Sequence, residues 1–284
     1  MSTIHSRVAS ARQQLRDAGL SSAEADLSAR LLAEHLLGWS TERFLVEAVE
    51  PEPAGFSARY NAAVARRVAR EPLPYITGRR EFWGLSFEVT PDVLIPRPET
   101  ELIVEVTLDL FPDPAAPVRV ADLCTGSGCV AIAIAHERSR ASVLATDISS
   151  AALAVARRNA VRHRVADRMQ FECADLLQNV SGIFDLIVAN PPYVRSGDRP
   201  ALQPEVREEP AVALFSGPEG LDVTRRLIAE APAFLRPGAH LIFEFGLGQE
   251  VEIEHLLAAS ESLTLIDMRR DIQGIARTAI ARRG

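Results

Sequence analysis

The sequence predicts an α/β protein. We expect a Rossmann-like domain with a mostly parallel, seven-stranded sheet whose last strand is antiparallel, preceded by a small helical bundle and a β-hairpin linker. Apolar residues recur at helical spacing up to about residue 71, alternate with polar residues from Phe82, and form alternating strand-like and helix-like segments from Val118 onward. The expected divisions are residues 1–75 for the bundle, 76–96 for the hairpin and 97–284 for the sheet-containing domain.

The composition is that of a folded protein from a reducing compartment. Hydrophobic residues make up 47% of the 284 residues and charged residues 24%, which excludes disordered and fibrous classes. No apolar run approaches the roughly 18 residues of a membrane span, and the first residues lack the apolar core of a signal peptide. Three cysteines are too few for a disulfide framework. We therefore expect a cytoplasmic protein that does not contact membranes.

The charged residues exclude some chemistry and disfavour one class of partner. The chain has no lysine, which excludes a Schiff-base lysine and a Walker-type phosphate-binding lysine. The net charge of −7 does not favour the phosphate backbone of nucleic acid, so a basic protein is the expected partner. Cys124 and Cys129 have no histidine in their segment, so no metal site is expected.

The first 71 residues predict helices. Leu27, Leu31 and Leu32 recur at i, i+4 and i+5, and this apolar stripe extends to Gly38. A second helix fits Ser57 to Arg70. Nothing in this part indicates catalysis, so its expected structure is a small bundle.

Alternation then predicts a β-hairpin. Leu85, Phe87 and Val89 alternate with polar residues, Pro91-Asp92 predicts the turn, and residues 93–95 predict the returning strand. A proline-stiffened loop follows, and the next helix is expected to begin at about Pro98.

The remaining chain predicts the sheet. Helices are expected between its parallel strands, for example Ser149 to Val161 and Leu221 to Leu235, whereas none separates the last two strands, which should pair antiparallel. The expected strands are Val118–Leu123, Val143–Thr146, Met169–Glu172, Asp185–Ala189, His240–Phe245, Leu263–Asp267 and Ala276–Ala281.

A glycine-rich turn, Thr125 to Gly128, follows the first strand of this sheet. Glycines let a backbone approach a ligand closely, and Asp147, about twenty residues later at the end of the second strand, can accept hydrogen bonds from ribose hydroxyls. S-adenosylmethionine, a nicotinamide or flavin cofactor, and a purely structural turn all remain open. Asp122 favours the methyl donor, because a carboxylate at that position would repel a pyrophosphate.

The tetrapeptide Asn190-Pro191-Pro192-Tyr193 follows the fourth strand, at the edge of the sheet where ligands bind. Its groups suit methyl transfer to a planar nitrogen. The Asn190 side-chain oxygen and the Pro191 carbonyl can each accept one N–H of the target, and Tyr193 can stack on the flat group. The prolines hold this geometry, so catalysis would come from proximity and orientation.

This tetrapeptide resembles the signature of amino-methyltransferases, and further segments resemble one family in particular, the HemK/PrmC-type glutamine methyltransferases of bacterial peptide chain release factors. The resemblance extends from about residue 5 to the C-terminus. The supporting segments are Pro72 to Gly78, Arg80 to Gly84, Leu94 to Glu101, Asp122 to Gly128, Asn190 to Tyr193 and Arg269 to Ile275.

The resemblance implies the function and the site. Such enzymes use S-adenosylmethionine to methylate the side-chain amide nitrogen of the glutamine in the Gly-Gly-Gln loop of class 1 release factors. They combine a helical substrate-recognition domain, a hairpin linker and a class I methyltransferase domain. The implied catalytic residues are Asn190, Pro191, Pro192 and Tyr193, and the implied cofactor-binding residues are Cys124, Thr125, Gly126, Ser127, Gly128, Asp147, Asp175, Leu176, Asn190 and Arg97.

Departures from the family pattern leave alternatives open. Cys124 stands where a glycine is common in the family, and Leu176 stands where some members carry an aromatic. The segment Asp122 to Cys129, with its cysteine at 124, is also typical of a sister enzyme that methylates a glutamine of a large-subunit ribosomal protein. A DNA adenine methyltransferase shares the tetrapeptide, but it would need a basic target-recognition region, which the sequence does not contain.

Overall fold

The structure, a computed structural model, describes residues 3–284, and the chain divides into two compact units. The first unit comprises the residues up to Gly78 together with residues 203–208, and the second comprises residues 79–202 and 209–284. The hairpin expected as a linker therefore belongs to the second unit.

Helices form the first unit. They are α1 (Ile4–Asp17), α2 (Ser22–Leu37), α3 (Thr41–Glu47), α4 (Phe56–Val68) and α5 (Leu73–Thr77). A capping box formed by Ser21 and Glu24 begins α2, and Gly38 ends it in the left-handed conformation. Phe56 and Tyr60 stack in the core, and the buried Tyr60 hydroxyl donates to the Ala29 carbonyl at 2.8 Å.

Residues 203–208 join the first unit through Glu205. This carboxylate accepts hydrogen bonds from Arg67 at 2.7 Å and from Arg70 at 2.9 Å. The Arg67 side chain is only 6% exposed. A buried guanidinium needs such a partner, so this ion pair attaches the segment to the end of α4.

The hairpin consists of β1 (Arg79–Phe82) and β2 (Leu85–Glu88), so the prediction of its turn was wrong. The turn is Trp83-Gly84, and both residues have positive φ, as a type I′ turn requires. Thr90 to Val93 does form a turn, with the Val93 N–H donating to the Thr90 carbonyl, but residues 93–95 form no strand.

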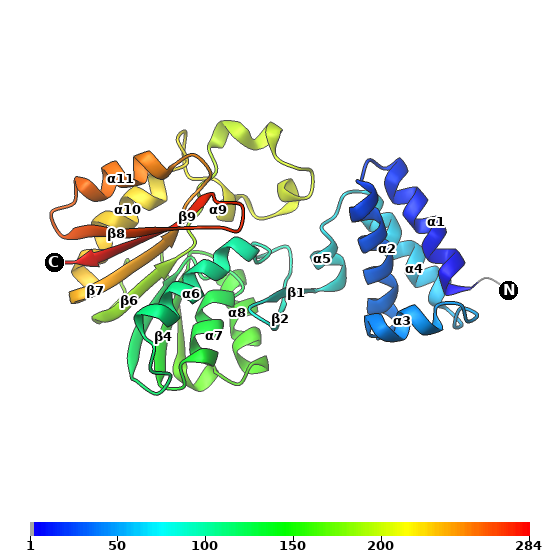
Figure 1. The fold of residues 1–284 in the computed structure, drawn as a ribbon, viewed down its shortest axis with the longest axis horizontal. Helices are drawn as coiled ribbons and strands as arrows, with labels where there is room; N and C mark the ends of the chain where they lie inside the picture. Colours follow the sequence, from blue (N-terminus) through cyan, green and yellow to red (C-terminus); the bar gives the residue numbers. More distant parts are fainter. Residues whose placement is uncertain (1–2) are drawn as a thin grey trace. The chain divides into compact units, whose positions relative to one another are not determined.

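The sheet of the second unit has seven strands in the order β5-β4-β3-β6-β7-β9-β8 (Figure 1). All neighbouring strands from β5 to β7 are parallel, and β9 runs antiparallel to both β7 and β8, which confirms the predicted fold class. The strands are β3 (Val118–Leu123), β4 (Ala141–Asp147), β5 (Met169–Cys173), β6 (Phe184–Ala189), β7 (Leu235–Glu244), β8 (Leu263–Arg270) and β9 (Ala276–Arg283).

Helices cover both faces of this sheet (Figure 1). The α-helices of this unit are α6 (Glu101–Leu110), α7 (Cys129–Glu137), α8 (Ser150–Arg162), α9 (Ala211–Leu214), α10 (Asp222–Glu230) and α11 (Glu250–Ala258). Short 3₁₀ helices occupy Pro98–Thr100, Ala166–Arg168, Ser196–Ala201 and Ala231–Phe234.

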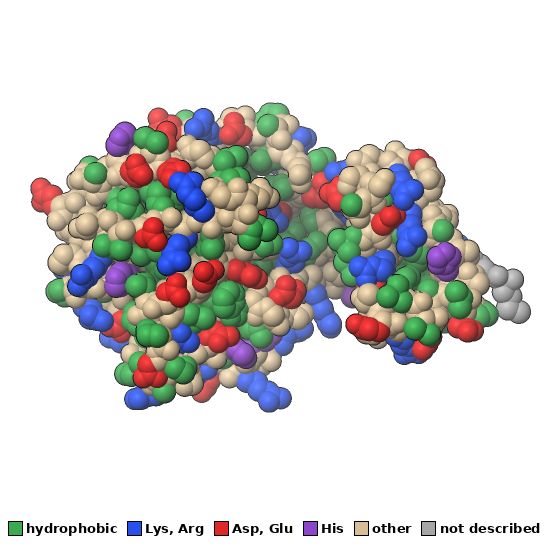
Figure 2. All heavy atoms as spheres, in the orientation of Figure 1, with side chains coloured by type: hydrophobic (Ala, Val, Ile, Leu, Met, Phe, Trp, Pro, Cys, Tyr) green, Lys and Arg blue, Asp and Glu red, His purple; other side chains and the backbone are tan. Residues whose placement is uncertain are grey.

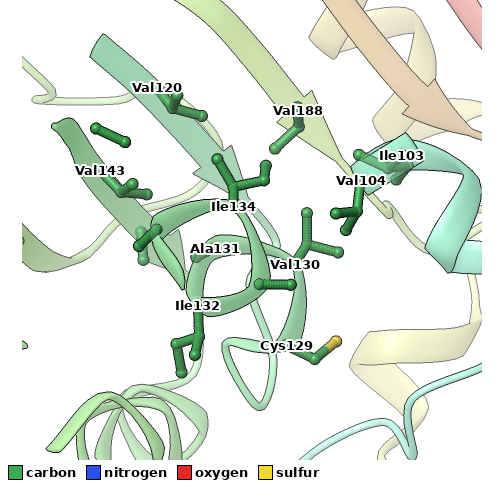
Figure 3. Close-up of a cluster of buried hydrophobic side chains, with 14 of the residues drawn as sticks. Ile103, Val104, Val120, Cys129, Val130, Ala131, Ile132, Ile134, Val143 and Val188 are labelled. Carbon is green, nitrogen blue, oxygen red and sulfur yellow. The ribbon is translucent and has the colours of Figure 1, made fainter. Parts of the chain in front are cut away.

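Alternation along the strands produces two cores. On β3, Val120 packs in a cluster with α6 and α7, whereas Ala121 packs in a separate cluster with α10 and α11. Figure 3 shows the first cluster, where Val130 and Ile134 of α7 lie among side chains from the strands and from α6. Because α7 is buried almost all round, it fixes the glycine turn that precedes it.

The surface carries charges of both signs. On the face shown in Figure 2, acidic and basic side chains are interspersed over the second unit. Within residues 3–284, no helix is both long and apolar enough to cross a membrane.

Candidate active site

The predicted site residues meet at the carboxyl edge of the sheet. The chain passes from β3 outward to β4 and β5, then returns to place β6 on the other side of β3. Ligands of open α/β sheets bind at such a switch point. The glycine turn follows β3, Asp147 ends β4, Asp175 follows β5 and Asn190 follows β6.

A cavity of about 240 Å³ lies at this edge. Its lining includes Arg97, Cys124, Thr125, Gly126, Ser127, Asp147, Asp175, Leu176, Asn190 and Pro192 from the predicted set. Gly128, Pro191 and Tyr193, which the sequence also predicted, are not part of that lining.

The two glycines of the turn have different surroundings. Both have positive φ, +54° at Gly126 and +80° at Gly128. A Cβ on Gly126 would meet no atom within 4 Å, whereas one on Gly128 would come within 3.1 Å of Ala156 and Ile132. Gly126 therefore keeps open space beside the cavity, and Gly128 permits close packing between α7 and α8.

Asp147 is fixed by backbone donors. Its Oδ2 accepts from the Gly126 N–H and its Oδ1 from the Ser149 N–H, each at 2.9 Å. Burial raises the pKa of this carboxyl, and these N–H bonds oppose the rise. Each carboxylate oxygen can accept a further hydrogen bond, so Asp147 can receive a hydroxyl donor from the cavity.

A second acid, Asp122, lies beneath the glycine turn. It is 2% exposed, and its Oδ2 accepts from the Thr125 hydroxyl at 2.6 Å and from the Ala131 N–H at 3.2 Å. Burial raises the pKa of Asp122 to about 7. This carboxyl thus shapes the turn and places a second acid in the lining of the cavity.

Cys124 and Leu176, two positions that depart from the family pattern, share an uncommon backbone conformation. Cys124 has a φ of 57° and Leu176 a φ of 54°, both in the left-handed region that glycine adopts most easily. Both line the cavity. Beside Leu176, Asp175 pairs with Arg226 of α10 at 3.0 Å, a partner that the sequence did not indicate.

Arg97 also lines the cavity and forms an ion pair with Glu209, whose side chain is 1% exposed. The other Glu209 oxygen accepts from the Ile95 N–H at 2.9 Å. Glu209 therefore fixes the loop that precedes α6 at both its backbone and its side chain.

Asn190 has one end held and one end free. Its Nδ2 donates to the Thr100 hydroxyl at 3.0 Å. Its Oδ1 is buried and has no hydrogen-bond partner among residues 3–284. An unpartnered buried oxygen at a cavity wall is a ready acceptor for a ligand N–H.

Two residues that the sequence analysis missed form hydrogen bonds with Tyr193 of the tetrapeptide. Glu244, at the end of β7, accepts from the Tyr193 hydroxyl at 3.0 Å. Gln249 donates to the Tyr193 carbonyl at 3.2 Å. The Glu244 carboxylate, followed by burial, raises the pKa of Tyr193 well above its usual 10, so Tyr193 stays neutral. An acid within one residue of the end of a predicted strand, the signal that identified Asp147, could also have identified Glu244.

Comparisons with known proteins confirm the family resemblance drawn from the motifs. Residues 8–78 match the PrmC N-terminal domain, and residues 102–217 match the methyltransferase small domain. A release factor glutamine methyltransferase of Burkholderia pseudomallei is 41% identical over 285 residues, 98% of each chain. Another, from Bradyrhizobium diazoefficiens, is 41% identical over 273 residues, 95% of this chain and 91% of that one.

Solved structures share the fold. A ribosomal protein L11 methylase from Lactobacillus delbrueckii subsp. bulgaricus aligns with a TM-score of 0.50 and 26% identity, covering 66% of this chain and 81% of that one. The hMettl16 catalytic domain aligns with a TM-score of 0.56 and 16% identity over 84% of each chain. Because the Burkholderia protein matches over nearly the full length of both chains, this chain belongs to the family of release factor glutamine methyltransferases.

Proposed function

We propose that this chain methylates the side-chain amide nitrogen of the glutamine in the Gly-Gly-Gln loop of class 1 release factors, with S-adenosylmethionine as the methyl donor. Family membership supports the reaction, and the names of the relatives favour a release factor over a large-subunit ribosomal protein as the substrate. Release factors act during translation, so the proposal places the enzyme in the cytoplasm.

The cavity fits the proposed donor. When bound, S-adenosylmethionine supplies an electrophilic methyl group. Asp147 presents a fixed carboxylate to the ribose hydroxyls, and the open space at Gly126 admits the methionine end. The cationic amino group of the donor would favour the ionised form of Asp122, and Asp175 and Leu176 line the cavity where the adenine would lie.

The free oxygen of Asn190 is the observation that carries the proposal. An amide nitrogen is a weak nucleophile because its lone pair is delocalised into the carbonyl. Asn190 Oδ1 accepts one N–H of the glutamine amide and the Pro191 carbonyl accepts the other. With both hydrogens held, the nitrogen is fixed in position and its lone pair can turn toward the methyl group. The nitrogen then forms one C–N bond as the S–CH₃ bond of the donor breaks, the demethylated donor leaves as a neutral thioether, and the amide proton passes to water.

The helical unit is proposed to recognise the rest of the release factor. The glycines beside the target glutamine have no side chains, so the loop itself offers little for recognition. Specificity must therefore come from contacts made elsewhere on the partner. The first unit has a core of its own and is not needed to form the cavity, which is lined by second-unit residues.

Transfer of a labelled methyl group tests this function. The enzyme is incubated with methyl-labelled S-adenosylmethionine and an intact release factor. A matched release factor whose loop glutamine is replaced by glutamate serves as the control, because it lacks the target nitrogen. We expect label on the first protein and none on the second. Equal labelling of both would show that another residue is the acceptor and would refute the proposal.

A further inference from the structure

A buried acid next to the tetrapeptide has no assigned role. Glu244 ends β7 and is 1% exposed. Its Oε2 accepts from the Thr100 hydroxyl at 2.6 Å, and its Oε1 accepts from the Tyr193 hydroxyl at 3.0 Å. No ion pair to Glu244 is seen within the described part of the chain. A carboxylate buried among hydroxyl donors alone is energetically unfavourable, which indicates a role other than stability.

This carboxylate determines the direction of the neighbouring hydrogen bonds. An ionised carboxylate can only accept, so Thr100 must use its single hydrogen to donate to Glu244. The Thr100 oxygen can then only accept from Asn190, and the atom placed to donate is Nδ2. The amide of Asn190 therefore has one permitted orientation, in which Oδ1 is turned away from Thr100.

The same acid also holds the other end of the tetrapeptide. Tyr193 donates its hydroxyl hydrogen to Glu244 directly, whereas Asn190 is connected to Glu244 through Thr100. One buried carboxylate therefore holds both residues of the tetrapeptide. The Thr100 hydroxyl and the Tyr193 hydroxyl come from segments that are 93 residues apart by their numbers, and Glu244 lies on a third segment. The network thus links the start of α6, the end of β6 and the end of β7.

We propose that Glu244 is a positioning residue for methyl transfer: acting through the Thr100 hydroxyl, its carboxylate orients Asn190 so that Oδ1 accepts an N–H of the glutamine amide. The inference rests on the proposed function and adds a residue to it. Without the carboxylate, Thr100 can donate to Asn190 instead, and the amide can turn its NH₂ group toward the target. Two N–H donors would then face each other, and the target nitrogen would not be held.

The protonation state of Glu244 should control this orientation. Burial raises its pKa to about 7, against hydrogen bonds from Thr100 and Tyr193 that lower it. Glu99 acts in the same direction as burial, whereas Arg277 opposes it. A protonated Glu244 can donate to Thr100, which frees the Thr100 hydrogen to point at Asn190. Activity should therefore be full well above pH 7, where Glu244 is ionised, and should fall as the pH is lowered through about 7.

A pair of substitutions tests the chain of hydrogen bonds. Glu244→Gln removes the charge, and Thr100→Val removes the relay with little change of shape. In each we expect kcat for release factor methylation to fall by roughly 10- to 100-fold, with the KM for the release factor and the Kd for S-adenosylmethionine changed by less than about twofold. The double variant should be no slower than the slower single variant, because both changes break one path.

Two controls separate positioning from a general loss of structure. Thr100→Ser retains the hydroxyl and should keep near-normal kcat. Thr107→Val removes an equally buried hydroxyl from α6, one that donates only to the Ile103 carbonyl, and should leave kcat unchanged. Thermal unfolding of every variant reports whether it is folded at the assay temperature.

The pH profile supplies the readout that a structural role would not give. Wild-type kcat should decline below about pH 7, and Glu244→Gln should have a low, flat profile. If the decline of kcat below about pH 7 persists in Glu244→Gln, another acid such as Asp122 causes it, and the inference is overturned. Normal kcat in Thr100→Val would also overturn it.

If a variant fails to fold, a flat wild-type profile would still refute the proposal. A wild-type enzyme that methylates no release factor would instead refute the proposed function itself.

Discussion

Asn190 illustrates how a single side chain can be prepared for a substrate. One end of its amide is held at 3.0 Å by Thr100, and the other end is buried without a partner among residues 3–284. Leaving a buried polar atom unsatisfied lowers stability by about 1–3 kcal/mol. Such a defect is expected where a ligand supplies the missing hydrogen bond.

Replacing Asn190 by alanine should separate catalysis from donor binding. We expect kcat to fall by about 100-fold or more, because the contact to the target nitrogen matters most in the transition state. Calorimetry should give an S-adenosylmethionine affinity close to that of the wild type. Near-normal turnover in this variant would rule out the proposed role of Asn190.

Replacing Asp147 by alanine should instead weaken binding of the methyl donor. The lost hydrogen bonds to the ribose should weaken S-adenosylmethionine binding by about 1.5–3 kcal/mol, the range for bonds to a charged group. Asp109→Ala, which removes an exposed acid of α6, is the control and should leave affinity unchanged. A different result would contradict this assignment: S-adenosylmethionine binds neither the wild type nor the variant, and Asp147→Ala lowers the affinity for a nicotinamide cofactor. The glycine turn would then be a dinucleotide-binding site.

Sequence patterns located the residues at strand ends but not the groups that support them. Asp147 and Asn190 could be predicted because each follows a recognisable apolar strand. Arg226 and Gln249 could not be predicted, because their partners Asp175 and Tyr193 lie more than 50 residues away in the sequence. Local sequence patterns do not indicate such distant contacts. Glu244 was predictable in principle, since it occupies the same kind of strand-end position as Asp147.

At the scale of elements, α8 connects the hairpin to the glycine turn through one buried amide. Asn159 is fully buried, and its Oδ1 accepts from the Glu88 N–H at 2.8 Å. Its Nδ2 donates to the Glu88 carbonyl at 3.0 Å and to the Ser127 carbonyl at 2.9 Å. The hairpin edge and the cofactor turn are therefore held by the same side chain.

Asn159→Ala should destabilise the protein and loosen that turn. Three backbone groups would lose their partner, and we expect the free energy of unfolding to fall by about 3 kcal/mol, measured by chemical denaturation. Arg158→Ala is a matched control, because Arg158 also contacts Glu88 but is exposed, and an exposed pair contributes under about 1 kcal/mol. Equal losses in the two variants would contradict this account of Asn159.

The elements were predicted unevenly, for physical reasons. The central strands of the sheet, such as β3 and β6, were found because their residues are buried on both faces. The hairpin turn was misplaced because β1, Arg79–Phe82, is largely charged and shows no apolar alternation. Trp83 at positive φ was a further obstacle, since such a conformation is uncommon for a bulky residue.

At the scale of the whole molecule, only one of the two units forms the cavity. The second unit contains the whole cavity, and the first contains none of its lining. The membership of residues 203–208 in the first unit was not predictable, because Glu205 contacts Arg70 across 135 residues of sequence. The segment that follows the tetrapeptide thereby reaches the helical unit.

A chain that begins at Arg79 should retain donor binding but lose recognition of its partner. We expect S-adenosylmethionine affinity near that of the full chain and much slower methylation of an intact release factor. A short Gly-Gly-Gln peptide is the control substrate, since it lacks the distant contacts and should react equally slowly with both enzymes. Circular dichroism would establish that the shortened chain is folded. Full-rate methylation of the release factor by this chain would exclude a recognition role for the helical unit.

The central claim is that the acceptor is the release factor glutamine, and mass spectrometry tests it most directly. The full-length enzyme is incubated with S-adenosylmethionine and an equal mixture of a class 1 release factor and the large-subunit ribosomal protein methylated by the sister enzyme. The account predicts a mass increase of one methylene unit on the peptide that contains the Gly-Gly-Gln loop, located at the glutamine side chain, and no change in the ribosomal protein. The same increase on a ribosomal protein glutamine, with the release factor unmodified, would contradict it.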